Sequence, residues 1–361
     1  MKAGIVGLPN VGKSTLFNCL SNAKAQSANF PFCTIEPNLG VVNVPDPRLE
    51  KLESLVKPER VMPATVEIVD IAGLVKGASK GEGLGNQFLG NIRECNAIIH
   101  VLRCFENDNI VHVDGSVDPI RDKETIDIEL QLKDLETVEK RLEKVTRAAK
   151  AGDKKAAKEM DLLNRVKEAL LTGVSARAVQ ISDEEKELLD SFQLLTTKPV
   201  LYVCNVDEKS AKNGNTYVEQ VKDAVKGEDA EVIVLAVATE ADITELESYE
   251  ERQMFLEDIG LEEPGASKLI RAAYHLLNLQ TYFTAGVKEV RAWTIHQGDT
   301  APQAAGVIHT DFEKGFIRAE VIAYNDFITY GSEAKVKEAG KMRVEGKEYI
   351  GERRRYYALP F

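Results

Sequence analysis

The chain has 361 residues, of which 43% are hydrophobic and 29% charged, and its formal net charge is -12. This composition is that of a folded protein with two or three domains, and it excludes global disorder. The negative charge argues against a protein that coats nucleic acid with its whole surface, although it is compatible with a local basic face. No apolar run approaches the roughly 18 residues of a membrane span.

The compartment is indicated by the cysteines and by the first residues. The five cysteines show no C-x-x-C spacing, which favours reduced thiols over disulfides or zinc. The chain opens on a short apolar strand at residues 3–6, so we do not expect a removable signal sequence. We therefore expect a cytoplasmic protein.

The first motif follows that strand and reads G-x-x-x-x-G-K-S over residues 7–14. The next segment places its apolar residues on one helical face, and this order of strand, loop and helix is typical of a phosphate-binding loop (P-loop). Gly7 and Gly12 let backbone N–H groups converge on phosphate oxygens at the positive end of the helix dipole. Lys13 is expected to bind the β- and γ-phosphates, and the Ser14 hydroxyl is expected to bind Mg²⁺.

Two later segments supply further candidate ligands. Residues 29–38 are punctuated by prolines and are not expected to be helical, and Thr34 within them is the candidate second Mg²⁺ ligand. The β-rich run 65–69 ends in D-x-x-G. Asp70 would hold the Mg²⁺ shell, and Gly73 would offer its N–H to the γ-phosphate. A glycine-rich tract at 77–90 is expected to move or to order with ligand.

The group that orients the attacking water is missing from its usual place. Related GTPases often carry a glutamine at the position of Leu74, and a leucine cannot position water. The apolar run 97–103 predicts a strand, and the loop after it contains His112, which could reach the γ-phosphate. A surface histidine without a catalytic role is the alternative interpretation.

From Asp122 the pattern becomes helical. Apolar residues recur every seven positions with a second set three residues on, and Gly152 separates this helix from another that runs to Gly173. We predict an antiparallel helical hairpin inserted into the nucleotide domain. Eleven Lys/Arg against seven Asp/Glu between residues 133 and 167 indicate a basic or simply solvated face. The apolar positions are Ile128, Leu135, Val138, Leu142, Val145, Leu163, Val166 and Leu170.

Residues 182–185 form a capping box that predicts one more short helix. The run 199–204 then predicts a buried strand, and 231–238 a further one. Together these periods predict an α/β fold with a doubly wound, mostly parallel sheet, interrupted by the helical insert.

The motifs together are similar to the Obg-related branch of translation-factor GTPases, except where such proteins read the base. Guanine-specific members carry N-K-x-D, whereas residues 205–208 read Asn205-Val206-Asp207-Glu208. Glutamate in the last place and valine in place of lysine point to adenine. A one-residue shift that uses Asp207 would restore some guanine recognition.

This combination closely resembles the YchF / Obg-like ATPase family along the whole chain. The resemblance implies an ATPase that prefers ATP over GTP, depends on Mg²⁺ and associates with ribosomes and RNA. It implies a P-loop NTPase domain at residues 1–121 plus 198–277, a helical insert at 122–197 and a β-grasp TGS domain at 278–361. It favours His112 as the substitute for the missing glutamine, and it suggests that Asn10 ligates K⁺.

The resemblance also assigns the contacts with the nucleotide. The residues that embrace the phosphates are Asn10, Val11, Gly12, Lys13, Ser14 and Thr15. Ser14 and Thr34 hold Mg²⁺, with Asp70 in its shell, while Asn205, the backbone at Val206 and Glu208 lie at the adenine.

The last part of the chain returns to strands. The runs 279–283, 290–295, 315–322 and 342–350, with a helix at 301–309, predict a small α+β domain, and the turn at Glu345-Gly346 predicts a hairpin. Between residues 335 and 355 there are eight Lys/Arg against four Asp/Glu, and Arg353-Arg354-Arg355-Tyr356-Tyr357 interleaves cations with rings. Such a stretch binds RNA, or it is a plain basic tail.

The leading hypothesis is a slow nucleotide-gated switch that hydrolyses ATP by in-line attack of water. Three alternatives stay open. A true GTPase would differ in its contact with the base, and a small-molecule kinase would use the helical insert as a lid. A non-catalytic RNA-binding scaffold would bind nucleotide without turning it over.

Overall fold

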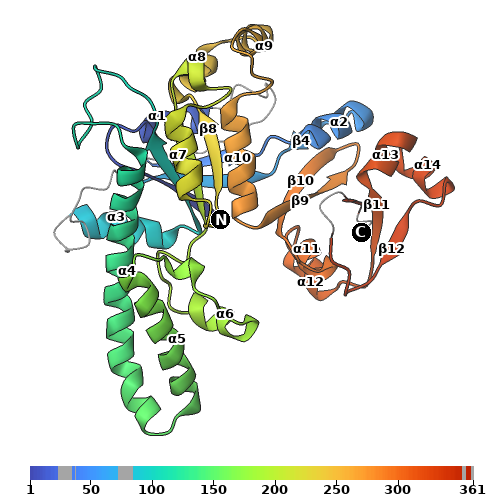
Figure 1. Cartoon of the computed structure of the whole chain (residues 1–361). Coiled ribbons are helices and arrows are strands. Elements are labelled where there is room, and N and C mark those ends of the chain that lie inside the picture. The colour runs from blue at the N-terminus through green and yellow to red at the C-terminus, as the bar shows by residue number, and fades with distance from the viewer. Residues whose placement is uncertain (23–34, 37, 72–83, 352–354, 359–361) are drawn as a thin grey trace. The chain divides into compact units, whose positions relative to one another are not determined.

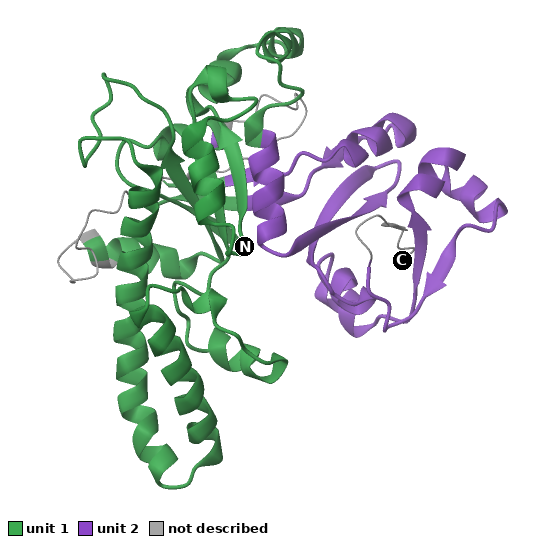
Figure 2. Cartoon of the chain, viewed as in Figure 1, with its two compact units in different colours: residues 1–20, 36–40, 67–266 green, residues 21–35, 41–66, 267–361 purple. Residues whose placement is uncertain are grey.

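The computed structural model describes residues 1–22, 35–36, 38–71, 84–351 and 355–358. Thr34, Gly73 and Leu74 lie outside these ranges, as do the glycine tract up to residue 83 and Arg353-Arg354. Contacts divide the chain into two compact units, coloured in Figure 2. Unit 1 comprises residues 1–20, 36–40 and 67–266, and unit 2 comprises 21–35, 41–66 and 267–361. The predicted boundaries at residues 122, 198 and 278 stay a prediction.

A seven-stranded sheet forms the centre of the nucleotide domain, in the order β2-β3-β5-β1-β6-β7-β8. The pairs β1 with β5, β1 with β6, β6 with β7 and β7 with β8 are all parallel. Strands β6 and β7 are buried along their whole length, as expected for strands covered on both faces. The predicted doubly wound sheet is therefore confirmed. Its strands are β1 (Lys2–Val6), β2 (Ile35–Glu36), β3 (Leu39–Asn43), β5 (Thr65–Asp70), β6 (Ala97–Arg103), β7 (Val200–Asn205) and β8 (Glu231–Leu235).

Helices lie between these strands and after β8, and two of them begin inside segments for which the sequence predicts something else. The run 231–238 was predicted as one strand, but β8 ends at Leu235 and α8 begins at Val237. The end of the glycine tract is helical, because α3 begins at Leu84. The helices are α1 (Lys13–Asn22), α3 (Leu84–Glu94), α7 (Thr216–Ala224), α8 (Val237–Glu245), α9 (Tyr249–Asp258) and α10 (Gly265–Leu276).

The helical hairpin consists of α4 (Pro119–Lys150) and α5 (Lys154–Leu171), which lie side by side (Figure 1). Asp118 caps α4 with Pro119 as its first residue, and Asp153 caps α5. Val138 packs with Leu163 and Val166 in one buried cluster, and Leu135 and Leu142 border it. The capping box at Ser182 starts α6 (Asp183–Asp190), as predicted.

Ile128 is not part of the predicted apolar face of this helix, because it is 51% exposed. The first third of α4 buries a different set of positions, including Ile126 and Leu130, and its packing against the cluster that contains α5 begins at Leu135. A strict seven-residue repeat therefore described only the distal part of this helix. An ideal helix drifts away from such a repeat by about 20° per heptad.

The described residues of unit 2 form two three-stranded sheets, ordered β4-β10-β9 and β12-β11-β13. Strand β4 comes from residues 60–62 and pairs in parallel with β10, so an early segment joins the late strands. The strands are β4 (Arg60–Met62), β9 (Leu279–Ala285), β10 (Glu289–His296), β11 (Ala319–Ala323), β12 (Arg343–Glu345) and β13 (Arg355–Ala358). The helices are α2 (Pro47–Val56), α11 (Ala301–Gly306), α12 (Thr310–Lys314), α13 (Tyr324–Tyr330) and α14 (Glu333–Glu338).

The predicted hairpin at residues 342–350 is wrong. β12 ends at Glu345 and pairs antiparallel with β11, while Ile350 forms a bridge with Thr300. The Tyr349 carbonyl accepts a hydrogen bond from the N–H of Ala301 at 2.7 Å. Residues after the turn are thus used at the start of α11 instead of folding back on β12. The neighbouring predictions were also too long, since β11 begins at Ala319 and α11 ends at Gly306.

Within the described ranges, every helix is too short or too polar to span a membrane.

Candidate functional site

The loop between β1 and α1 adopts a conformation that only its own residue types fit. Gly7 and Gly12 have φ angles of 156° and 101°, and Asn10 has 64°. A Cβ on Gly7 would lie 2.6 Å from the Val101 carbonyl oxygen, and one on Gly12 would lie 2.6 Å from Asn205 Nδ2. Side chains at either glycine would therefore push the loop away from β6 and β7.

Lys13 begins α1 and is only 7% exposed. Its Nζ donates a hydrogen bond to the Leu8 carbonyl at 2.8 Å, inside the loop. Burial lowers the pKa of this ammonium, and the charge of Asp70 partly offsets that effect. The side chain thus holds a cation within the loop, where phosphate oxygens are expected.

Ser14 and Asp70 meet below the loop. Ser14 Oγ donates to Asp70 Oδ2 at 2.9 Å, although the two residues are 56 positions apart. The other carboxylate oxygen, Oδ1, is buried and has no hydrogen-bond partner in the described part of the chain. A buried carboxylate oxygen left alone is costly, and hard oxygen ligands suit Mg²⁺. This pair therefore fits the predicted metal position. The other predicted ligand, Thr34, is outside the described residues.

Asn205, predicted at the base, ties three segments together. Its side chain is buried, donates to the Val11 carbonyl at 2.9 Å and accepts from the Val237 N–H at 3.0 Å. The segment that opens α8 was not singled out from the sequence. Because carboxyl ends of neighbouring parallel strands share one edge, the end of β8 could have been inferred from the position of Asn205.

Of the other three residues in the base-reading tetrad, Val206 is buried, whereas Asp207 and Glu208 are exposed. Val206 is buried and donates its N–H to the Leu235 carbonyl at 3.0 Å. The Asp207 carboxylate accepts from the Ser210 N–H at 3.0 Å and so caps a short 3₁₀ turn. Glu208 is exposed. Asp207 is therefore held by its own turn, while Glu208 projects toward solvent.

His112 lies in the loop after β6 and is 7% exposed. Its Nε2 lies 2.8 Å from Asp122 Oδ2, and its Nδ1 accepts from the Asp114 N–H at 3.1 Å. Both ring nitrogens are thus engaged by protein groups. A catalytic role for His112 stays a prediction, and it requires the ring to leave Asp122.

Sequence reasoning missed Arg103, which organises the same loop. This arginine ends the buried strand β6 and is itself 2% exposed. Its guanidinium donates to the carbonyls of Phe105, Asn107 and Ile110 at 3.2, 3.1 and 2.9 Å. The signal was a charged residue at the end of an otherwise apolar run, where burial requires partners.

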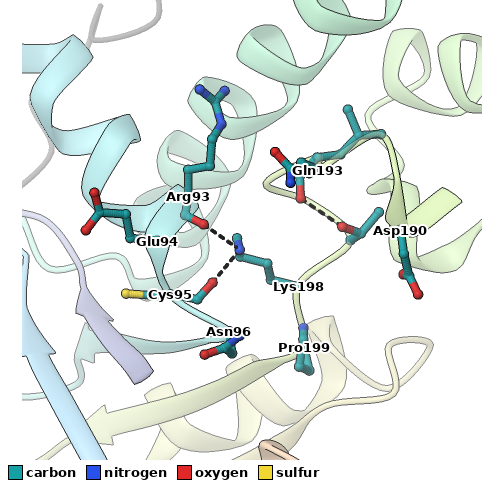
Figure 3. Close-up of a pocket in the computed structure, with 10 residues that line it drawn as sticks. Arg93, Glu94, Cys95, Asn96, Asp190, Gln193, Lys198 and Pro199 are labelled. Atoms are coloured by element: carbon teal, nitrogen blue, oxygen red, sulfur yellow. Dashed lines mark hydrogen bonds between the residues drawn. The ribbon is translucent and has the colours of Figure 1, made fainter. Parts of the chain in front are cut away.

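A separate cavity of about 380 Å³ opens where strands β6 and β7 begin, at the opposite end of the strands from the P-loop (Figure 3). It lies beside Asn96 and Pro199, just before β6 and β7 begin, whereas the P-loop follows the end of β1. Lys198 points toward α3 and donates to the carbonyls of Arg93, at 3.1 Å, and Cys95. Burial lowers the pKa of this lysine. This cavity is distinct from the P-loop site.

The parallel sheet, the P-loop at the end of its central strand and the Ser14–Asp70 pair define a P-loop nucleotide-binding domain of the GTPase-like class. A family model described as "50S ribosome-binding GTPase" matches residues 2–145. The model YchF-GTPase_C, described as "Protein of unknown function (DUF933)", matches residues 279–353.

Relatives that match nearly the whole chain identify its family. It is 60% identical over 349 residues to the ribosome-binding ATPase YchF of Escherichia coli O157:H7, across 97% of this chain and 96% of that protein. It is 56% identical over 352 residues to the protein of the same name from Bacillus subtilis (strain 168), with the same shares. The solved structure of the Schizosaccharomyces pombe YchF GTPase is 40% identical, with a TM-score of 0.89 over 100% of this chain and 97% of that one. The chain belongs to the YchF family, as its motifs predicted.

Proposed function

We propose that this protein is a nucleotide-gated switch that binds and hydrolyses ATP with Mg²⁺ and associates with the ribosome or its RNA. The observation that carries the proposal is the Ser14–Asp70 pair below the P-loop, with its buried, unpartnered carboxylate oxygen. The names of the bacterial relatives, ribosome-binding ATPases, support both the activity and the partner.

The residues of the chain supply most of the required chemistry. Lys13 and the N–H groups of the P-loop bind the phosphates and neutralise the charge that develops on the γ-phosphate. Ser14 and Asp70, with Thr34, would hold Mg²⁺, which would neutralise negative charge on the phosphates. Gly73 is proposed to donate its N–H to the γ-phosphate.

His112 is the proposed replacement for the water-orienting glutamine, because Leu74 has no polar atom to offer. We expect His112→Ala to lose turnover of ATP while nucleotide affinity is retained. Equal turnover in the variant would return His112 to a structural role. Asn10 is proposed to ligate K⁺, so replacing K⁺ by Na⁺ should slow hydrolysis.

ATP is the proposed substrate, and GTP is the second candidate. The solved relative from Schizosaccharomyces pombe and the N-terminal family model are both named as GTPases. In this chain one oxygen of the Asp207 carboxylate accepts from the Ser210 N–H, and glutamate stands at position 208, which together support the loss of guanine reading. Competition of ATP and GTP against a labelled nucleotide tests the proposal directly. A strong preference for GTP would overturn it.

The tip of the helical hairpin supports contact with a polyanion. Five cations near the tip are exposed, and the acidic residue between them, Asp153, is occupied as the N-cap of α5. In a chain with a net charge of -12 this is a local reversal of sign. We propose that the tip meets ribosomal RNA. The cations are Lys144, Arg147, Lys150, Lys154 and Lys155.

A charge-neutralised pair of variants tests the tip. Lys154→Gln with Lys155→Gln should weaken co-sedimentation with ribosomes roughly tenfold at 0.1 M salt and reduce its salt dependence. The matched control is Lys222→Gln with Lys226→Gln on and just after α7, which removes two exposed lysines elsewhere. Equal losses in both double variants would mean that net charge, and not the tip, governs binding.

A further inference from the structure

The loop between β6 and α4 is held by the protein at both of its ends. At its start, the buried Arg103 guanidinium binds the carbonyls of Asn107 and Ile110. At its end, the Asp118 side chain accepts hydrogen bonds from two N–H groups in the first turn of α4. His112 lies between these anchors and is therefore carried by a loop of defined shape.

The middle of the loop makes contacts in two directions. Asn10 of the P-loop donates its side-chain N–H to the Val111 carbonyl at 3.1 Å. The next residue, His112, contacts Asp122 in the first turn of α4 at 2.8 Å. Two adjacent residues thus join the phosphate-binding loop to the helix that forms one arm of the hairpin.

The hydrogen bonds define the tautomer of His112. Nδ1 accepts from the Asp114 N–H, so it carries no proton in this arrangement. The proton is on Nε2, which donates it to Asp122 Oδ2. The side chains of His112 and Asp122 are 4% and 1% exposed, so the bond is shielded from water. Neither ring nitrogen is free to bind a water or a phosphate while both bonds are made.

The same cluster does not provide a convincing metal site. Ligand atoms of His112, Asp114 and Asp122 all lie within 4.8 Å of one another. However, the Arg121 guanidinium pairs with Asp122 at 3.0 Å and lies 3.7 Å from Asp114. Arg121 thus contacts both carboxylates, and both nitrogens of the ring are used.

We infer that Asp122 is a positioning residue for His112. It holds the ring in the Nε2–H tautomer and away from the phosphates until a movement of α4 releases it. Because α4 is a continuous helix of 32 residues that reaches the tip, binding at the tip can bias this bond. The inference rests on the proposed function, since it assumes that released His112 assists hydrolysis.

The test uses Asp122→Asn, which keeps the shape of the side chain but removes the charge that holds both the ring and Arg121. A hydrogen bond to a charged group changes a two-state equilibrium by roughly tenfold or more. We therefore expect the basal kcat for ATP to rise by roughly three- to tenfold with KM unchanged. The matched control is Glu124→Gln, an exposed acid in the same part of α4, which should leave kcat unchanged.

Two further measurements separate positioning from mere support of the fold. In the His112→Ala background, Asp122→Asn should no longer raise kcat. With His112 intact, Asp122→Glu keeps the carboxylate and should leave kcat at the wild-type value. Imidazole ¹⁵N shifts should show the Nε2–H tautomer in the wild type and a mixture in Asp122→Asn. An unchanged tautomer, or a change in kcat that persists without His112, would overturn the inference.

Failure of the proposed function gives a different result. A wild-type protein that does not hydrolyse ATP would reject the ATPase assignment and, with it, release of His112 for hydrolysis. The imidazole shifts would still report whether Asp122 sets the tautomer, because that measurement needs no turnover.

Discussion

Asn205 shows how a residue assigned to the base can act first on the phosphate loop. Its amide satisfies the Val11 carbonyl and the Val237 N–H, and both contacts are buried. In Asn205→Ala these two groups lose their partners, so we expect the free energy of unfolding to fall by about 2–4 kcal/mol. Urea denaturation of the nucleotide-free protein measures this loss. The exposed Glu208→Gln serves as control, and an equal effect in both variants would contradict the prediction.

His100, in the middle of β6, makes stability depend on pH. Burial, helped by the charge of Lys123, lowers its pKa to about 3, and its Nε2 has no hydrogen-bond partner in the described residues. In the unfolded chain the pKa of His100 is near 6.5, so below that pH the unfolded state binds a proton at this residue and the folded state does not. Stability is therefore full above pH 6.5 and falls as the pH is lowered toward 3.

Replacing His100 should remove this loss. At pH 5 the histidine should cost roughly 2 kcal/mol relative to pH 7.5, and His100→Leu should flatten the curve by that amount. Unfolding free energies at the two pH values give the answer. His296→Gln, an exposed histidine, should keep the wild-type slope. An unchanged slope in His100→Leu would show that other groups cause the acid sensitivity.

At the scale of elements, prediction from the sequence succeeded where one period applied throughout. β6 is the whole predicted run 97–103, and α5 buries its predicted residues Leu163 and Val166. Prediction from the sequence failed where a strand or bridge forms only with a partner that is distant in the sequence. β4 pairs with β10, a strand more than 200 positions later, and Ile350 bridges to Thr300 instead of closing a hairpin. Neither partner is visible in a local window of residues.

The candidate site was likewise predicted only in part from the sequence. Motif spacing predicted Lys13, Ser14 and Asp70, and the structure brings the last two within 2.9 Å. The spacing gave no reason to pair His112 with Asp122, because an acid ten positions away on a predicted helix is common and its direction depends on the loop between them. That loop is shaped by Arg103, whose partners are backbone carbonyls and so leave no signature in residue types.

Asp134 attaches α4 to the segment that precedes β7. Asp134 is buried and accepts from the N–H groups of Leu195 and Thr196 at 2.8 and 2.7 Å and from the Thr196 hydroxyl. Asp134→Asn turns one acceptor into a donor facing other donors, so we expect a loss of about 3 kcal/mol. Hydrogen exchange should accelerate in α4 near this residue. Glu143→Gln, exposed on the same helix, should leave exchange unchanged.

For the whole molecule, the two compact units should respond differently to nucleotide. The P-loop, Asp70 and Asn205 all belong to unit 1, whereas β9 and β10 belong to unit 2. A ligand that binds only the folded state at 100 times its Kd stabilises that state by about 2.7 kcal/mol. We therefore expect ATP with Mg²⁺ to slow amide exchange in β1, β6 and β7 about a hundredfold, while β9 and β10 keep their rates. If all five strands are protected equally, the units unfold together, and the proposed coupling to the ribosome would then have to act through the stability of the whole chain instead of through α4.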